Sequence, residues 1–303
     1  MRVPTNSNSD QMIQRISDLS ARQAKLQTQV STGQRIFQPE DDPAAMGRVL
    51  SLKSEKSQLT QFKTNAAYAL DLSNATYSAL TSINKISDRA GEIATLSTGS
   101  ITTETYDAYA EEVNQLIEQG TQLANTKLGN NYLFAGTNLS SPAYTRTPPT
   151  GDIASVTYAG NASQVTIPLS ENSSIAPGST TQTNNDIATF INDLIALRDA
   201  LKSKDPAAVA TVKENLIGSD TISGDENNIV NALSAQGAIQ MRIEISNTQR
   251  TARLDNIDKL VSGEVDVDLP EAITKLSQAT TAYEAALQST SRIMQISLLD
   301  YLK

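Results

Sequence analysis

Both ends of this 303-residue chain carry heptad repeats of apolar residues, with steps that alternate between three and four. A helix with such a stripe cannot bury it alone and needs a partner helix. Two such helices at opposite ends of the sequence predict a chain that folds back on itself and whose ends can also join other copies. The residues that we assign to this assembly interface are Met12, Ile16, Leu19, Leu26 and Val30 near the start and Leu269, Ile273, Leu276, Tyr283, Leu287, Met294, Leu298 and Tyr301 near the end, with Gln23 and Thr280 filling polar seam positions.

The periodicity between the two ends predicts further helices. Long helices are expected over residues 43–98 and 225–262, because both repeat apolar or small residues at heptad spacing. Asp42 and Pro43 form a helix start signal, since Asp42 can cap the helix and Pro43 suits its first position. The remaining helices are expected over residues 9–31, 103–128, 186–203 and 206–217 and from residue 268 onward, with Gly33 and Gly263 as stops.

The segment of residues 129–185 differs from the rest because it is rich in Ser, Thr, Asn, Gly and Pro and nearly uncharged. Within it, residues 153–158 and 164–169 alternate apolar and polar side chains on either side of a turn-like centre, which predicts a β-hairpin. Residues 132–134 are predicted to form a short strand. The segment is therefore expected to be a small β-containing insertion between helices.

These elements predict a mainly α fold: an elongated antiparallel helical bundle or coiled coil from both chain termini, with a small β-containing insertion in the middle. Simple nesting pairs the first helix with the last and the helix at 43–98 with the helix at 225–262. Aromatic residues make up only 4% of the chain, which favours thin bundles over a thick core. The expected domains are a terminal coiled-coil assembly domain (1–42 and 264–303), a long-helix bundle (43–128 and 186–263) and a variable β-rich outer domain (129–185).

The composition narrows the possible functions. The chain has no Cys and no His, which removes thiol catalysis, disulfides, the commonest general base and the commonest zinc ligand. Its net charge of −9 argues against a sequence-independent grip on nucleic acid. No apolar run approaches the ~20 residues of a membrane span, and no cleaved signal peptide is visible near the start. We therefore expect no enzyme, no metal, no cofactor, no nucleic-acid partner and no membrane span.

The acidic cluster of Glu40, Asp41 and Asp42 has a chemical and a structural interpretation. Chemically, it is a candidate hard-cation site or a pair of catalytic carboxylates. Structurally, it is a loop followed by a helix cap, and we favour this second interpretation. A glycosidase with two converging carboxylates stays open, because sequence alone does not show which carboxylates converge.

Several segments resemble the flagellin superfamily. Residues 29–36 (Gln-Val-Ser-Thr-Gly-Gln-Arg-Ile) and 39–45 (Pro-Glu-Asp-Asp-Pro-Ala-Ala) are similar to its N-terminal signature. The Asp-Asp-Pro is closer to the hook–filament junction branch than to the flagellins proper, which usually have Asp-Asp-Ala. Residues 128–137 (Leu-Gly-Asn-Asn-Tyr-Leu-Phe-Ala-Gly-Thr) and the C-terminal residues 283–288 and 297–302 also resemble the junction branch, while the opening Met-Arg-Val-Pro-Thr differs at two places from its usual Met-Arg-Ile-Ser-Thr.

The resemblance implies a secreted structural protein of the bacterial flagellum. In this superfamily the terminal helices form an inner tube and the middle region faces outward, and export uses the flagellum's own type III apparatus. For this chain it implies a homo-oligomeric ring at the hook–filament junction, with a neighbouring hook-associated protein and flagellin as partners. It also implies a flagellar secretion chaperone on the C-terminal helix before export. The alternatives are a filament-forming flagellin and, more distantly, a type III translocator or tip protein.

Overall fold

The structure is a computed structural model that describes residues 5–99, 101–218 and 224–301, with side chains described from residue 10 to residue 292 outside the same gaps. The chain divides into two compact units, residues 1–58 with 252–303 and residues 59–251. The helices are α1 (Thr5–Thr32), α2 (Pro43–Ser97), α3 (Thr103–Ala124), α4 (Thr181–Ser203), α5 (Pro206–Ile217), α6 (Asp225–Val265) and α7 (Leu269–Tyr301). The strands are β1 (Lys127–Leu128), β2 (Asn131–Tyr132), β3 (Tyr144–Thr147), β4 (Ser155–Tyr158), β5 (Ile167–Ser170) and β6 (Ser173–Ile175).

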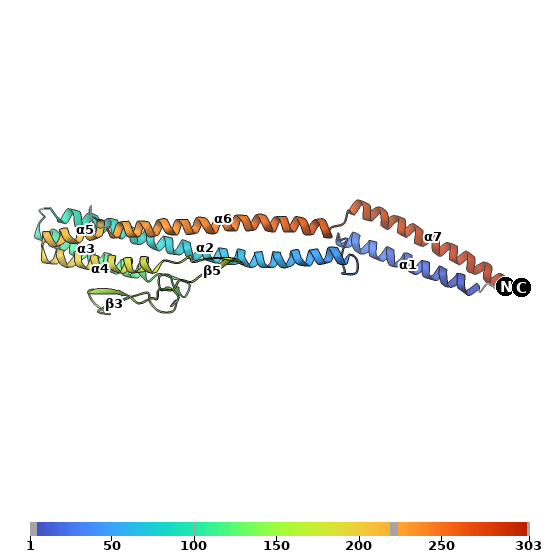
Figure 1. The fold of residues 1–303 in the computed structure, drawn as a ribbon, viewed down its shortest axis with the longest axis horizontal. Coiled ribbons are helices and arrows are strands. Elements are labelled where there is room, and N and C mark those ends of the chain that lie inside the picture. Colours follow the sequence, from blue (N-terminus) through green and yellow to red (C-terminus); the bar gives the residue numbers. More distant parts are fainter. Residues whose placement is uncertain (1–4, 100, 219–223, 302–303) are drawn as a thin grey trace. The chain divides into compact units, whose positions relative to one another are not determined.

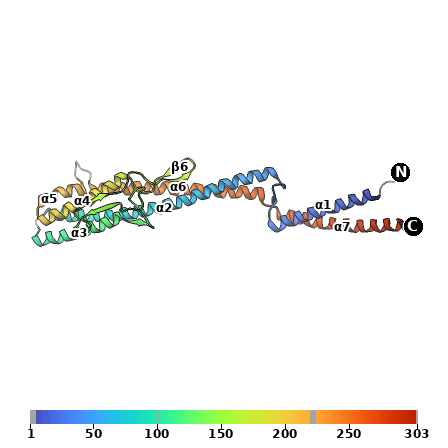
Figure 2. The same ribbon diagram turned by 90° about the horizontal axis from the view of Figure 1, so that it is seen from below.

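The first unit is built from the two ends of the chain. Its helices α1 and α7 lie side by side in both views (Figures 1 and 2). Within the same unit, the first part of α2 lies against the last part of α6, and ion pairs join Arg48 to Glu264 and Arg253 to Glu55. The predicted nesting is therefore confirmed, since the first helix pairs with the last and the two long helices pair with each other.

The second unit holds the large hydrophobic core. Helices α3 and α4 pack along each other, with α5 against α4, and together with the inner parts of α2 and α6 they enclose the bulkiest side chains. The predicted heptad positions of the α2–α6 pair turn inward: Gln236 on α6 donates to the Ser73 hydroxyl at 2.6 Å inside the seam. The fully buried side chains at the centre include Phe134, Tyr144, Phe190, Leu194 and Leu197.

Helix ends follow local capping chemistry in most places. Gly33 has a φ of +71°, which ends α1 as expected. Asp268 Oδ1 accepts from the Glu271 N–H at 3.1 Å and starts α7.

Several expected boundaries were wrong. Helix α1 begins at Thr5 instead of residue 9, and α3 ends at Ala124 instead of residue 128, because Lys127 and Leu128 form β1. Helix α6 continues through Gly263 to Val265, since a glycine inside a long helix costs only about 1 kcal/mol, and α4 begins at Thr181, because the Thr180 hydroxyl caps it.

The predicted hairpin between residues 153–158 and 164–169 was wrong in its pairing. Both segments contain a strand, but β4 pairs with β3, and β5 pairs with β6 across a two-residue turn. The residues between the two segments do not form a turn, because Asn161 is tied to Thr137: its Oδ1 accepts from the Thr137 N–H at 2.9 Å. The predicted short strand at 132–134 is β2, which begins one residue earlier and ends at Tyr132.

Two asparagine side chains close the edges of the β3–β4 hairpin. The Asn125 amide accepts from the Tyr144 N–H at 3.0 Å and donates to the Tyr144 carbonyl at 2.9 Å. The Asn192 amide makes the same pair of bonds with Val156, at 3.0 and 2.8 Å. Each amide takes the place that a peptide group of a neighbouring strand would fill. The hairpin is thereby fastened to the helices and offers no free backbone at these two positions.

Within the described ranges, no helix combines the length and the apolar character needed to cross a bilayer.

Candidate assembly surface of the terminal helices

The seam between α1 and α7 is narrow and made mostly of small or half-buried side chains. Helix α1 contributes one buried residue, Leu26, and four half-buried ones from the predicted stripe: Met12, Ile16, Leu19 and Val30. Helix α7 contributes the buried or half-buried Ala272, Leu276, Ala279, Thr280, Tyr283, Ala286 and Thr290. Gln23 Nε2 donates to the Thr280 hydroxyl at 3.5 Å, so the two polar seam positions meet across the pair.

Three residues that the sequence assigns to the interface lie on the outer flank of this seam. Leu269, Ile273 and Leu287 are 44%, 54% and 43% exposed. Alanines one residue before Ile273 and Leu287, at positions 272 and 286, lie toward α1 in their place. Helix α7 includes three more predicted interface residues whose side chains lie outside the described residues: Met294, Leu298 and Tyr301.

Sequence reasoning missed four exposed large apolar residues among the described residues of the same unit, including Leu50 on α2 and Leu260 on α6. Ile13 on α1 is 55% exposed, and Phe37 in the loop after α1 is 57% exposed. The signal for Ile13 is its position directly after Met12, which widens the apolar stripe of α1 to two adjacent residues. Phe37 has no such signal, because a lone aromatic residue in a loop is compatible with either burial or exposure.

The loop from α1 to α2 and the link from α6 to α7 are fastened to each other, and we call this contact the linker joint. Residues Gln34 and Asp266 form an antiparallel bridge. The Arg35 N–H donates to the Val265 carbonyl at 2.6 Å, and the Val267 N–H donates to the Gly33 carbonyl at 2.9 Å. The loop after α1 and the link before α7 are therefore joined by backbone hydrogen bonds, as two short antiparallel strands would be.

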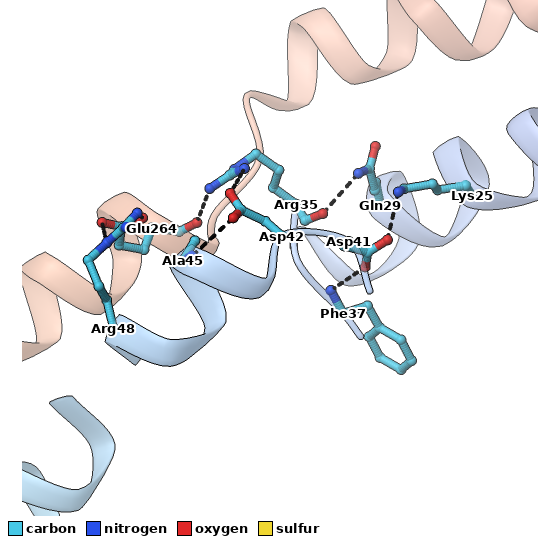
Figure 3. Close-up of polar contacts among 9 residues, drawn as sticks. All are labelled: Lys25, Gln29, Arg35, Phe37, Asp41, Asp42, Ala45, Arg48 and Glu264. Atoms are coloured by element: carbon cyan, nitrogen blue, oxygen red, sulfur yellow. Dashed lines mark hydrogen bonds and ion pairs between the residues drawn. The ribbon is translucent and has the colours of Figure 1, made fainter. Parts of the chain in front are cut away.

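Charged side chains reinforce the linker joint (Figure 3). The Arg35 guanidinium donates to the Glu264 carbonyl at 2.8 Å and to Asp42 Oδ2 at 3.3 Å. The Arg48 guanidinium forms two bonds of 2.9 Å with the Glu264 carboxylate and lowers the pKa of that carboxyl. Asp42 Oδ1 accepts from the Ala45 N–H at 3.0 Å at the start of α2, and this bond, followed by Arg35, lowers the pKa of Asp42.

Asp41 holds the exposed Phe37 in one place (Figure 3). Its Oδ2 accepts from the backbone N–H groups of Phe37 and Gln38 at 2.9 and 3.0 Å, and its Oδ1 pairs with the Lys25 ammonium at 2.6 Å. The hydrogen bond from Lys25, with smaller effects of the two N–H groups, lowers the pKa of Asp41 to about 2. The acidic cluster therefore serves as a turn and a helix cap in the structure, and its aspartates are already engaged with protein donors.

Two hollows among the described residues give no support for a ligand site. A hollow of about 270 Å³ lies between Phe37 and α1, but it is an open depression of the surface. In the second unit, a cavity beside Tyr68 and Tyr132 has room for about 30 Å³, close to the volume of one water. Among the described residues, no three Asp or Glu side chains gather closely enough to hold a metal ion.

Comparison with known proteins gives a consistent set of similarities. The model of the bacterial flagellin N-terminal helical region matches residues 3–139, and that of the bacterial flagellin C-terminal helical region matches residues 220–302. Flagellar hook-associated protein 3 of Escherichia coli (strain K12) is 23% identical over 321 aligned residues, which cover 100% of both chains.

Solved structures show the same fold. A candidate flagellar hook-associated protein from Vibrio parahaemolyticus is 18% identical, with a TM-score of 0.65 over 75% of this chain and 100% of that one. FlgL of Bacillus cereus is 17% identical, with a TM-score of 0.60 over 70% of this chain and 99% of that one.

Proposed function

Because this chain belongs to the flagellin family, we propose that it is a structural protein of the flagellum that joins the hook to the filament. The similarity to hook-associated protein 3 runs over the full length of both chains, which supports the junction role over that of a filament-forming flagellin. The proposed place of action is the extracellular hook–filament junction. The role rests on helix packing, and no step of it requires an enzyme or a cofactor.

The observation that carries the assembly mechanism is that α7 has apolar side chains for two partners and meets one. Every seventh residue at positions 272, 279 and 286 is an alanine that lies toward α1, and Leu276 and Tyr283 lie in the same seam. Ile273 and Leu287, also a multiple of seven apart, are exposed beside them. Three apolar positions per heptad form a wider apolar stripe than the two-position seam of a simple coiled coil.

We assign the second neighbour of α7 to another copy of this chain. Ile13, Leu269, Ile273 and Leu287 are exposed apolar residues of the α1–α7 pair, and we call them the flank residues. We take the repeat of Ile273 and Leu287 along α7 as an association surface. In a ring of copies, the flank residues of one pair would be covered by the terminal helices of the next. The other predicted residues, such as Leu26 and Leu276, would then hold the pair itself together.

The proposed partners follow from the position of a junction ring. A neighbouring hook-associated protein would lie on the hook side and flagellin on the filament side, each meeting the ring through terminal helices. Before export, the exposed flank of α7 would suit the groove of a flagellar secretion chaperone, since an amphipathic helix is a common groove ligand. The proposed outer part is the β-containing segment of residues 129–185.

Deletion of the gene in its host, followed by electron microscopy of cells and medium, tests the proposed function. We expect hooks without filaments and flagellin shed into the medium, both restored by the wild-type gene. Attached filaments of normal length would contradict the junction role. Polymerisation of the purified chain into long filaments would instead support the filament-forming alternative.

A further inference from the structure

Two aspartates meet inside the second unit, where α6 begins. Asp225, the first residue of α6, is only 5% exposed, and Asp193 on α4 is half-buried beside it. The start of α6 is tightly held, because a side-chain carbon at Gly224 would lie 2.2 Å from the Gly218 nitrogen at the end of α5. The pair therefore lies where α4, the end of α5 and the start of α6 come together.

The hydrogen-bonding of this pair is incomplete if both carboxyls are ionised. Asn215 on α5 donates to Asp193 Oδ1 at 3.4 Å, but Asp225 Oδ2 is buried and has no hydrogen-bond partner in the described structure. A buried acceptor without a donor is costly, and two carboxylates in contact also repel each other. One proton between them would remove both penalties, since it supplies the missing donor and cancels one charge.

Within the described part of the chain, no positively charged group acts on Asp225 to balance a second carboxylate. The charged groups that act on Asp225 are Asp193 and Asp186, both on α4 and both acidic. Glu226 follows in the first turn of α6, so α6 also contributes no cation there, and α5 contributes the neutral Asn215. The start of a helix favours a negative charge, but this effect is small against the burial of a carboxylate.

We infer that Asp193 and Asp225 share one proton in the folded chain and so form an acid clasp that holds the start of α6 against α4. Ionisation of the clasp leaves two buried negative charges in contact and loosens the first turn of α6. The direction of the pKa values agrees with this geometry: burial and the neighbouring Asp193 raise the pKa of Asp225 to about 8, and burial also raises the pKa of Asp193. The clasp is independent of the proposed junction role.

The pH dependence follows from this assignment. An aspartate in the unfolded chain ionises near pH 4, whereas the clasp keeps its proton until about pH 8. The folded state therefore binds more protons than the unfolded state between these values, so stability falls as the pH rises from about 4 to 8. The contribution of the clasp is complete below pH 4 and lost above pH 8.

Titration of the carboxyl carbons by NMR in the uniformly ¹³C-labelled full chain tests the clasp directly. We expect one aspartate carboxyl with a midpoint near pH 8 that is absent in Asp225→Asn. In Asp193→Asn, where the repulsion is removed, we expect the midpoint of Asp225 to move down by one pH unit or more. Midpoints below pH 5.5 for every aspartate in the wild type would overturn the inference, and this measurement needs no variant to fold.

Unfolding by urea at several pH values from 5 to 9 provides the second test. We expect Asp225→Asn to flatten the decline in stability that the wild type shows over this range. Glu226→Gln is the matched control, because it removes a nearby carboxylate that does not act on Asp225, and it should keep the wild-type decline. An equal decline in the wild type and Asp225→Asn would overturn the inference.

Calcium chloride and magnesium chloride distinguish a proton from a metal ion at this position. We expect millimolar concentrations of either salt to leave the midpoint near pH 8 unchanged. A midpoint displaced below pH 5, together with one bound ion per chain, would show a cation site and overturn the shared proton.

Discussion

The two units of the molecule differ in how completely the chain covers its own apolar surface. In the second unit, large side chains such as Phe190, Leu194 and Leu197 are fully buried among several elements. In the described part of the first unit, only seven apolar residues are buried, three of them alanines, while Phe37 and the flank residues are exposed. The second unit therefore has a large core of its own, and the smaller core of the first agrees with our proposal that other copies supply helices to cover it.

The largest expected effect is the loss of a core side chain in the second unit. Phe190→Ala should reduce the free energy of unfolding by about 3–5 kcal/mol, because it removes a fully buried ring and leaves a cavity. Urea denaturation followed by circular dichroism measures this loss. Leu96→Ala is the matched control, since Leu96 is an exposed residue of the same unit and should change stability by less than about 1 kcal/mol. Equal losses in both variants would contradict the role of Phe190 in the core of the second unit.

Aspartate substitutions on the two faces of α7 distinguish the role of the α1–α7 seam from that of the flank residues. Leu276→Asp places a charge inside the α1–α7 seam and should reduce both the helicity of the monomer and assembly. Ile273→Asp and Leu287→Asp place the same charge on exposed positions and should block assembly while leaving monomer stability within about 0.5 kcal/mol. Circular dichroism of the monomer and swimming of complemented cells measure the two effects. Normal swimming with either flank variant would contradict the proposed contact between the flank residues and another copy.

Removal of the Asn192 side chain, which hydrogen-bonds the edge of the β3–β4 hairpin, should weaken the hairpin without unfolding the helices. Asn192→Ala leaves the N–H and carbonyl of Val156 without their present partners, a loss of about 1–3 kcal/mol. Hydrogen exchange of the Val156 amide should accelerate accordingly. Asn185→Ala is the matched control, because Asn185 is an exposed residue of the same helix and should leave this amide protected. An unchanged exchange rate in Asn192→Ala would show that the two hydrogen bonds of Asn192 add no stability.

Protonation of Asp41 should have the smallest effect, and we expect it to loosen the loop that holds Phe37. The lowered pKa of Asp41 means that its contacts stabilise the fold above about pH 4 and are lost as the pH falls through about 2. The Phe37 and Gln38 amides should therefore stay protected from exchange between pH 7 and pH 4 and lose this protection near pH 2. In Asp41→Ala the protection should be absent at every pH. Protection that persists in this variant would mean that other contacts order the loop.

The sequence predicted the regular part of the fold well, because periodicity is a local signal. The heptads of α2 and α6 place the same faces inward that the structure buries, for example at Ser73 and Gln236. Strong caps such as Asp205 and Asp268 start α5 and α7 where they were expected. The strand pairing was not predictable in this way, because the choice of β3 as the partner of β4 involves Asn192 on a distant helix.

The candidate surface shows the same division at the level of single residues. The sequence by itself determined that α1 and α7 carry apolar stripes and need partner helices, since a 3.6-residue turn brings heptad positions to one face. It did not determine which of those residues meet inside the chain. The rotation of α7 about its axis, with Leu276 inward and Ile273 outward, was decided by the tertiary structure, because the small side chains of Ala272 and Ala279 allow α1 to lie close on that side. The acid clasp was likewise decided by tertiary structure, since only the packing of α4 against the start of α6 brings Asp193 to Asp225.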